Sequence, residues 1–436
     1  MNYKIRNLGV ISDRRSAAII DKRGDICWYC PEQFDNPSLF ASLLDAEKGG
    51  VWSLNLHDKY KVERGYIGNS SILETRFRTK GDTFTVTDWM PLNDDFLGIC
   101  RVFSSSSVSR KNILAPAPGY GRETLEIRNI NDTTISINNK YFLMISHPAH
   151  VENGRISFEI PANESGWAIL TDREMNIKDD RQLKKSLQKT QNGWEELSSD
   201  FSYEGSYKKD MFDSLRAIRQ VTHQESGGII AALTTSLPEV PGGERNYDYR
   251  YVWLRDASMI VSALTRAQTN GKDQKRFLDF ICSARGNVKD YSTTPFVTVN
   301  KQAAPAEEYL NFSGHLSSKP VRVGNNANEQ LQWDAGSNIL LAAKLIYGNT
   351  NTRIHWKVVA EIADSLAENW HHDDYGIWEE DIARQFTSSK VITAVALRFI
   401  SDYSKDGTQK KRWLETAKAI RHFVENNCIT SSGSYA

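Results

Sequence analysis

The spacing of apolar residues changes near residue 200 of this 436-residue chain, and this change constrains the fold more than any other feature. Before it, apolar and polar residues alternate, as at residues 83–90, 134–137 and 156–160. A period of two is typical of strands with one buried face. Because turn-forming residues separate many such short runs, the first part of the chain is predicted to be an antiparallel β-sandwich.

After residue 207, apolar residues recur every three to four positions, which predicts helices with one apolar face. The first helix is marked by Met211, Leu215, Ile218 and Val221. Further helices are predicted at residues 257–267, 275–284, 328–346, 354–370, 389–403 and 411–424. Several of the loops between them are long, and such loops are where binding residues tend to lie.

These two patterns predict a multidomain protein. We expect residues 1–177 to form an N-terminal β-sandwich domain and residues 207–436 to form an all-α array of helical hairpins. Residues 178–206 are charged and polar, with a helical stretch at residues 182–197, and are predicted to be a linker.

The composition favours a neutral partner. Lys and Arg total 54, as do Asp and Glu, so the net charge gives no reason to expect nucleic acid or an anionic membrane as partner. The 11 Trp and 17 Tyr residues would suit a carbohydrate, although most are expected in the core. No apolar run approaches the roughly 18–20 residues of a membrane span. Scattered cysteines and a start without a secretory leader lead us to expect a cytoplasmic protein.

Two short clusters could be mistaken for metal or redox sites. Cys27 and Cys30 have the spacing of a redox motif, but they lie in an apolar run with no second ligand pair. The His-His-Asp-Asp run at residues 371–374 would point in different directions on a helix, and it is expected to be a solvated helix end. The sequence therefore predicts no metal and no cofactor.

A candidate acid lies in a short turn between two predicted helices. Glu379 follows Trp378 there, and a low-dielectric neighbour such as an indole raises a carboxyl pKa toward neutrality. A general acid needs such a pKa at pH 7.

A candidate sugar clamp lies upstream of this acid. Arg255 and Asp256 stand close to Tyr249 and Trp253, and these groups can hold a polyhydroxylated ring by hydrogen bonds and stacking. An acid together with such a clamp predicts chemistry on a glycosidic bond.

The chain resembles glycoside hydrolase family 15, the glucoamylase-like enzymes, along nearly its whole length. The matching stretches occur in family order at residues 26–30, 34–37, 86–92, 234–239, 242–251, 253–257, 320–325, 330–332, 376–379 and 386–390. Departures from the family pattern at Cys27, Tyr247, Ser388 and residues 334–337 leave the substrate preference open.

The resemblance implies a β super-sandwich joined to a barrel of six helix pairs, and an inverting hydrolase that releases glucose from the non-reducing end of α-linked glucosides. By position, Glu379 matches the general acid. The matching substrate-binding residues are Tyr249, Trp253, Arg255, Asp256, Trp378 and Glu380. The leading interpretation is a glucoamylase-type α-glucosidase acting on an oligosaccharide or disaccharide. The alternatives are a trehalase of the same family and a non-catalytic carbohydrate-binding protein.

No residue can be assigned as the second carboxylate of an inverting hydrolase. Such a base lies roughly 6.5–9.5 Å from the acid and activates water. The resemblance implies that it lies in a late loop of the barrel, yet the predicted helices would leave the barrel incomplete. Three interpretations stay open: a fragment of a longer enzyme, a split gene product completed by a second polypeptide, or a remnant that binds sugar at most. The chain alone is expected to show no glucosidase activity.

Overall fold

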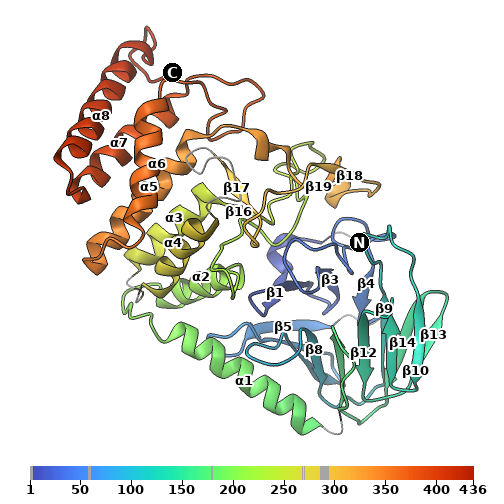
Figure 1. Cartoon of the computed structure of the whole chain (residues 1–436). Coiled ribbons are helices and arrows are strands. Elements are labelled where there is room, and N and C mark those ends of the chain that lie inside the picture. The colour runs from blue at the N-terminus through green and yellow to red at the C-terminus, as the bar shows by residue number, and fades with distance from the viewer. Residues whose placement is uncertain (1–2, 57–59, 178–179, 268, 270, 285–293) are drawn as a thin grey trace.

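The computed structural model describes residues 3–56, 60–177, 180–267, 269, 271–284 and 294–436 (Figure 1). In that view a two-layered β-structure lies at the lower right and a group of helices at the upper left. The order along the chain, strands first and helices second, is the order that the change of apolar period predicts.

The strands of the N-terminal part form two antiparallel sheets. The first sheet contains β1 (Gly9–Ser12), β2 (Ala17–Ile20), β3 (Ile26–Tyr29), β4 (Val51–Ser53), β9 (Arg110–Ala115), β13 (Ala149–Glu152) and β14 (Arg155–Ile160). The second contains β5 (Lys61–Tyr66), β6 (Leu73–Arg78), β7 (Thr83–Trp89), β8 (Gly98–Phe103), β10 (Ile127–Asn131), β11 (Thr134–Ile137), β12 (Tyr141–Ile145) and β15 (Gly166–Thr171). The strand orders are β1-β2-β3-β4-β9-β14-β13 and β10-β11-β12-β15-β8-β7-β6-β5.

The core of the sandwich consists of apolar side chains from both sheets. On β7 the alternate residues Phe84 and Val86 are buried, and they share one apolar cluster with Leu114 and Ile156 of the other sheet. Period-two burial of this kind is what places one face of a strand in the core. The strands predicted at residues 83–90, 134–137 and 156–160 are confirmed as β7, β11 and β14.

Eight α-helices follow within the part of the chain that the structure describes. They are α1 (Asp180–Ser198), α2 (Lys208–Gln220), α3 (Leu254–Arg266), α4 (Lys272–Ala284), α5 (Trp333–Thr350), α6 (Trp356–Asn369), α7 (Thr387–Ile400) and α8 (Gly407–Asn427). Four short strands lie in the loops between them: β16 (Val252–Trp253), β17 (Phe296–Val297), β18 (Glu308–Leu310) and β19 (Val321–Val323). Fewer than six helix pairs are present among the described residues, so the barrel is incomplete there.

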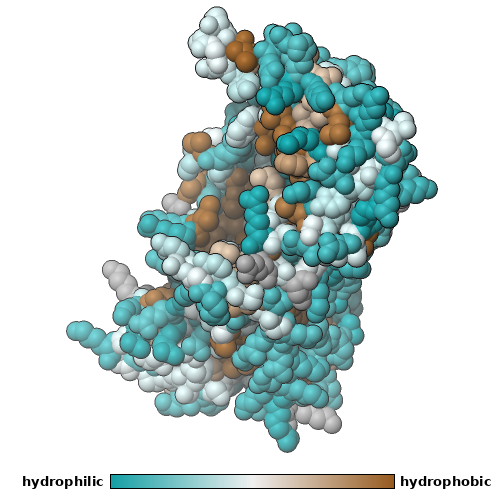
Figure 2. Space-filling model, turned by 90° about the vertical axis from the view of Figure 1, so that its left-hand side faces the viewer, coloured by the Kyte–Doolittle hydropathy of each residue, from teal (hydrophilic) through white to brown (hydrophobic). Residues whose placement is uncertain are grey.

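Alternate helices pack side by side around a second apolar core. α5 lies against both α3 and α7, and α7 lies against α8. Their buried residues, such as Val261, Leu340 and Leu397, belong to one cluster. In Figure 2 more apolar side chains reach the surface in the upper half, where the helices lie, than in the lower half. Among these surface residues of the helices are Val391 and Val395 of α7, which are 43% and 39% exposed.

α1 is the helix that the sequence predicts at residues 182–197, and it packs against the sandwich. Its Ser186 hydroxyl accepts a hydrogen bond from Trp89 Nε1 at 3.4 Å, and its Thr190 hydroxyl accepts one from the backbone N–H of Leu92 at 3.1 Å. These contacts fix α1 to the end of β7.

The helix predicted to begin at residue 328 begins five residues later. Asn326–Glu329 forms a 3-10 turn, and Gln332 has an extended backbone before α5 starts at Trp333. The reason is a separate local cap, because the Asn325 side chain accepts a hydrogen bond from the backbone N–H of Ala327 and closes the 3-10 turn.

No helix in the described part of the chain is long and apolar enough to cross a membrane. The five cysteines are unpaired, and Cys27 and Cys30 are buried at and just after β3.

Candidate active site

The loop between α6 and α7 carries Glu379 and has a fixed backbone. Asp374 and Arg384 exchange two backbone hydrogen bonds of 2.8 Å, which close the loop at its base. Gly376 has a φ of 64°, and a Cβ there would lie 2.8 Å from the ring of Phe386, so only glycine fits. Glu379 itself has a φ of 55°, an uncommon backbone conformation for a residue with a side chain, and such outliers cluster at functional sites.

Arg255 and Asp256 lie in the first turn of α3. β16 pairs with β17 and leads directly into this helix, with Trp253 at the N-cap position. An acidic residue in the first turn is favourable because it faces the positive end of the helix dipole. The short strand pair therefore fixes where the Arg255 side chain begins.

Arg255 contacts three carboxylates from three different segments. Its Nη2 lies 3.6 Å from Glu379 Oε1, its Nε 3.3 Å from Asp256 Oδ2, and its Nη1 3.4 Å from Asp334 Oδ2. Nη1 also donates a hydrogen bond of 3.4 Å to the Gln332 side-chain oxygen. The Arg255 side chain is 12% exposed, so these charges interact in a largely desolvated site.

The pKa of Glu379 is raised to about 7. Burial is the largest cause, and the negative charges of Asp256 and Asp334 add to it, whereas Arg255 lowers the pKa. The pKa of Glu379 is thus shifted in the direction expected from the sequence, but the expected cause is wrong. Trp378 is 71% exposed, because the loop directs its ring outward, and it does not desolvate the carboxyl group.

The aromatic residues near Arg255 form a wall. Trp253 is buried, with its ring 4.4 Å from that of Phe296 between centroids, and Arg255 Cζ lies 5.5 Å from the indole. The ring of Tyr249 lies 5.9 Å from the indole and is half-buried. The pKa of Tyr249 is raised to about 12, first by burial and second by the charge of Glu379.

The structure brings together five of the seven residues that the sequence singled out: Glu379, Arg255, Asp256, Tyr249 and Trp253. Trp378 and Glu380 are exposed and lie on the rim of the same loop. Glu380 is fixed there by a hydrogen bond of 3.1 Å from its backbone N–H to the carbonyl oxygen of Tyr375.

Asp334 and Gln332 belong to this site and were not given a role by the sequence. The Asp334 side chain is 5% exposed, and its Oδ1 has no hydrogen-bond partner among the described residues. Burial raises its pKa, and the charge of Asp256 raises it further. Its position in the first turn of a helix beside the matched stretch at residues 330–332 was the available signal.

The solvated helix end predicted at residues 371–374 is wrong for Asp374. His371, His372 and Asp373 are exposed, but Asp374 is fully buried, and burial raises its pKa to about 6. The reason is that the first N–H groups of a helix need acceptors. Asp374 Oδ2 accepts the backbone N–H of Trp333 at 3.3 Å and so caps α5. Among the described residues, no cluster of His, Cys, Asp and Glu is arranged to hold a metal.

A sandwich is joined to an array of helical hairpins, and a near-neutral carboxyl group in the loop between α6 and α7 lies beside Arg255 at the start of α3. Two family matches define the chain as a glycoside hydrolase. Residues 205–436 match the family described as Glycosyl hydrolases family 15, and residues 2–160 match the family described as Trehalase-like, N-terminal. The chain belongs to glycosyl hydrolase family 15.

Several curated relatives resemble the chain over almost its full length. Trehalase 2 from Sulfolobus acidocaldarius is 29% identical over 98% of this chain and 76% of its own length. Trehalase from Thermoplasma volcanium is 27% identical over 99% of this chain and 72% of its own length. A bacterial glucoamylase solved in complex with acarbose has the same fold, with a TM-score of 0.63 and 11% identity over 99% of this chain and 68% of that one.

Proposed function

We propose that the protein is a trehalase, which hydrolyses trehalose to two molecules of glucose. The observation that carries the proposal is the match to proteins named trehalase over 98–99% of the chain, which includes a trehalase-like N-terminal part. The leading interpretation of the sequence was a glucoamylase-type enzyme. At 11% identity, the likeness to the bacterial glucoamylase is one of fold alone and does not favour that activity.

Glu379 acts as the general acid in this proposal. A carboxyl group with a pKa of about 7 is protonated in a large fraction of molecules at neutral pH and can donate its proton to the glycosidic oxygen. The resulting carboxylate lies 3.6 Å from the Arg255 guanidinium, which stabilises the negative charge as it forms. Arg255 thus favours the charged state that follows proton transfer.

Arg255, Asp256 and Tyr249 hold the glucose whose bond is cleaved. The Asp256 side chain is 43% exposed, so its carboxylate can accept hydrogen bonds from sugar hydroxyls. The Arg255 guanidinium packs over the buried ring of Trp253, which helps to hold it in place. Asp334 and Gln332 position Arg255 through its Nη1.

Trp378 and Glu380, exposed on the loop rim, contact the leaving glucose. Inversion also needs a base about 6.5–9.5 Å from the acid, on the opposite side of the sugar. Asp256 and Asp334 are poor candidates for this base, because Arg255 holds both.

A substrate panel tests the proposal. Trehalose, maltose, isomaltose and soluble starch are incubated with the full-length protein, and released glucose is quantified at several concentrations. We expect kcat/KM for trehalose to exceed each other value by about tenfold or more, because a subsite built for the leaving sugar discriminates to that extent. Faster hydrolysis of maltose or starch would support the glucoamylase interpretation instead. Trehalose binding without any hydrolysis would support the non-catalytic one.

A further inference from the structure

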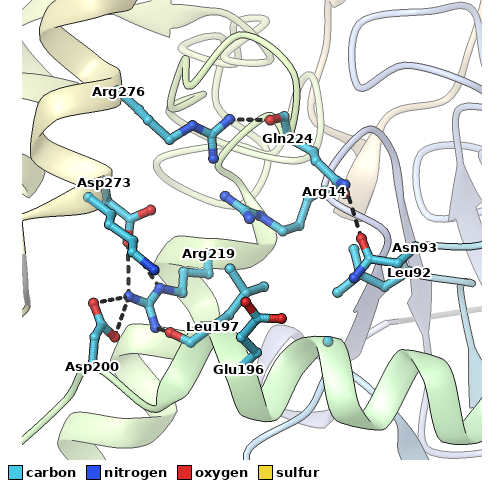
Figure 3. A pocket seen from close by; sticks show the side chains of 12 residues that line it. Arg14, Leu92, Asn93, Glu196, Leu197, Asp200, Arg219, Gln224, Asp273 and Arg276 are labelled. Atoms are coloured by element: carbon cyan, nitrogen blue, oxygen red, sulfur yellow. Dashed lines mark hydrogen bonds and ion pairs between the residues drawn. The ribbon is translucent and has the colours of Figure 1, made fainter.

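A cavity of about 340 Å³ shares no lining residue with the candidate active site. It lies where the sandwich meets the helices (Figure 3). Arg14 enters it from the turn between β1 and β2, Asn93 from the segment after β7, and Arg219 and Arg276 from α2 and α4. Segments distant in the sequence therefore bring three arginines together at one place.

Arg219 neutralises the buried acids of this cavity. Its Nη2 lies 2.8 Å from Asp200 Oδ1 and 3.0 Å from Asp273 Oδ2. These three side chains are 3%, 8% and 7% exposed, so they form a closed buried network. Glu196, a further acid in the lining, is exposed to solvent. The buried carboxylates of Asp200 and Asp273 are therefore already paired with Arg219.

Arg14 and Arg276 have no carboxylate within ion-pair distance among the residues that the structure describes. Arg14 is 3% exposed, and its Nε donates a hydrogen bond of 3.3 Å to the carbonyl oxygen of Thr222. Its Nη2 is buried without a hydrogen-bond partner among those residues, and Figure 3 shows its guanidinium pointing into the space beside Arg276. Arg276 donates to the carbonyl oxygens of His223 and Gln224.

A buried guanidinium without a counter-charge is costly. The pKa of Arg14 is lowered to about 10. Burial is the largest cause and the positive charges of Arg276 and Arg219 add to it, while the more distant charges of Asp273 and Glu225 offset only part of the shift. An anion placed between Arg14 and Arg276 would offset both effects. Arginine suits this role because its planar fork of N–H donors matches the oxygens of a phosphate or sulfate group.

We propose that this cavity is a binding site for a small tetrahedral oxyanion, with Arg14 and Arg276 as its ligands. Because Arg14 belongs to the sandwich and Arg276 to α4, the bound anion ties the two parts of the molecule together. Occupancy should therefore raise the stability of the whole protein, since a ligand that binds only the folded state stabilises it.

Calorimetric titration and thermal unfolding of the full-length protein test this site. Inorganic phosphate is compared with chloride at matched ionic strength, and we expect saturable binding of phosphate and a Tm that rises with its concentration. Arg14→Gln should weaken binding by about 10- to 100-fold, since it removes charge-assisted hydrogen bonds. Arg276→Gln should act in the same direction and serves if the first variant does not fold. Arg122→Gln, an exposed sandwich arginine paired with Glu308, is the matched control and should bind as the unaltered protein does.

Two results would overturn the proposal. One is the absence of saturable phosphate binding by the unaltered protein. The other is binding that persists in both Arg14→Gln and Arg276→Gln, which would place the anion elsewhere, for example at Arg255. A parallel titration with a hexose phosphate identifies the source of the anion. Competition between the two ligands supports a site for the phosphate group of a metabolite, and binding of inorganic phosphate alone supports a site for the free ion.

Discussion

At the scale of single residues, Arg255 sets the charge balance of the candidate active site. It contacts Glu379, Asp256 and Asp334 through three different nitrogen atoms. One guanidinium cannot neutralise three carboxylates, so a proton is retained near neutral pH. Burial and the two other acids place that proton on Glu379, whose pKa is raised to about 7.

Replacing Glu379 by Gln should remove the acid and keep the shape. We expect kcat for trehalose to fall by about 10²–10⁴-fold with KM little changed, because the proton is needed only as the bond breaks. Steady-state kinetics on the full-length protein measure both constants. Asp373→Asn, an exposed change in the same loop, is the control and should keep the original rate. An active Glu379→Gln variant would exclude this residue as the proton donor.

Replacing Asp334 by Asn should move the pH profile. The charge of Asp334 raises the pKa of Glu379, so its removal lowers that pKa. A general acid works only when protonated, and activity is therefore lost as pH rises through its pKa. The alkaline limb of the kcat/KM profile should shift to lower pH in Asp334→Asn and stay in place in Asp402→Asn, whose side chain is 71% exposed. A limb that stays in place in Asp334→Asn, or shifts upward, would contradict the assignment.

The sequence could predict part of this site only. Arg255 and Asp256 are neighbours in the chain, so their pairing is local. Asp334 reaches Arg255 from the first turn of α5, and Glu379 reaches it from the loop between α6 and α7, after the packing of α3, α5 and α7 has brought these segments together. Trp378 precedes Glu379 in the chain, yet the left-handed backbone at Glu379 turns the two side chains apart. Adjacency in the chain was therefore a poor guide to what desolvates the acid.

At the scale of elements, the loop between α6 and α7 holds the acid through backbone geometry. The hydrogen-bonded pair Asp374 and Arg384 closes the loop, and the same Asp374 caps the start of α5 with its side chain. The sequence predicted the helices from their period but missed where α5 begins. The 3-10 turn that Asn325 closes delays the start of α5, and the Asp374 cap comes from 41 positions away, so the apolar period alone does not show where the helix begins.

Gly376→Ala should misplace the acid. An alanine at a φ of 64° is strained, and its Cβ would collide with the ring of Phe386. We expect kcat to fall by about 10- to 100-fold, because small displacements of catalytic groups cost that much, while the protein stays folded. Kinetics and circular dichroism measure the two effects. Gly407→Ala is the control, since nothing lies within 4 Å of a Cβ built there. This variant should change neither kcat nor the circular dichroism spectrum. An unimpaired Gly376→Ala variant would show that the loop need not be rigid.

At the scale of the whole molecule, the buried side chain of Arg250 links the two parts of the chain. Arg250 Nη2 lies 2.7 Å from Asp248 Oδ2, with side chains 1% and 0% exposed. Arg250 Nη1 also donates a hydrogen bond of 3.0 Å to the carbonyl oxygen of Asn36, in the segment after β3. One side chain thus links the strand-rich part to the loop that leads into α3.

Arg250→Gln should destabilise the whole protein, because it leaves Asp248 buried without its charge partner. We expect the free energy of unfolding to fall by about 3–5 kcal/mol. Arg245→Gln breaks a surface pair with Glu239, whose side chains are 58% and 52% exposed, and should cost less than about 1 kcal/mol. Urea denaturation followed by fluorescence compares them. Equal losses in the two variants would mean that Arg250 does not join the two parts.

The central claim is inverting hydrolysis of trehalose. The anomeric forms of the two glucose molecules released in the reaction test this claim most directly. Both anomeric carbons of trehalose are α, so inversion at one of them yields one β-glucose, while the leaving glucose remains α. Proton NMR of the full-length protein with trehalose, recorded before the anomers interconvert, should show α- and β-glucose in equal amounts. Release of α-glucose alone would mean retention of configuration and would contradict the account. A folded protein that binds trehalose but releases no glucose would contradict it as well.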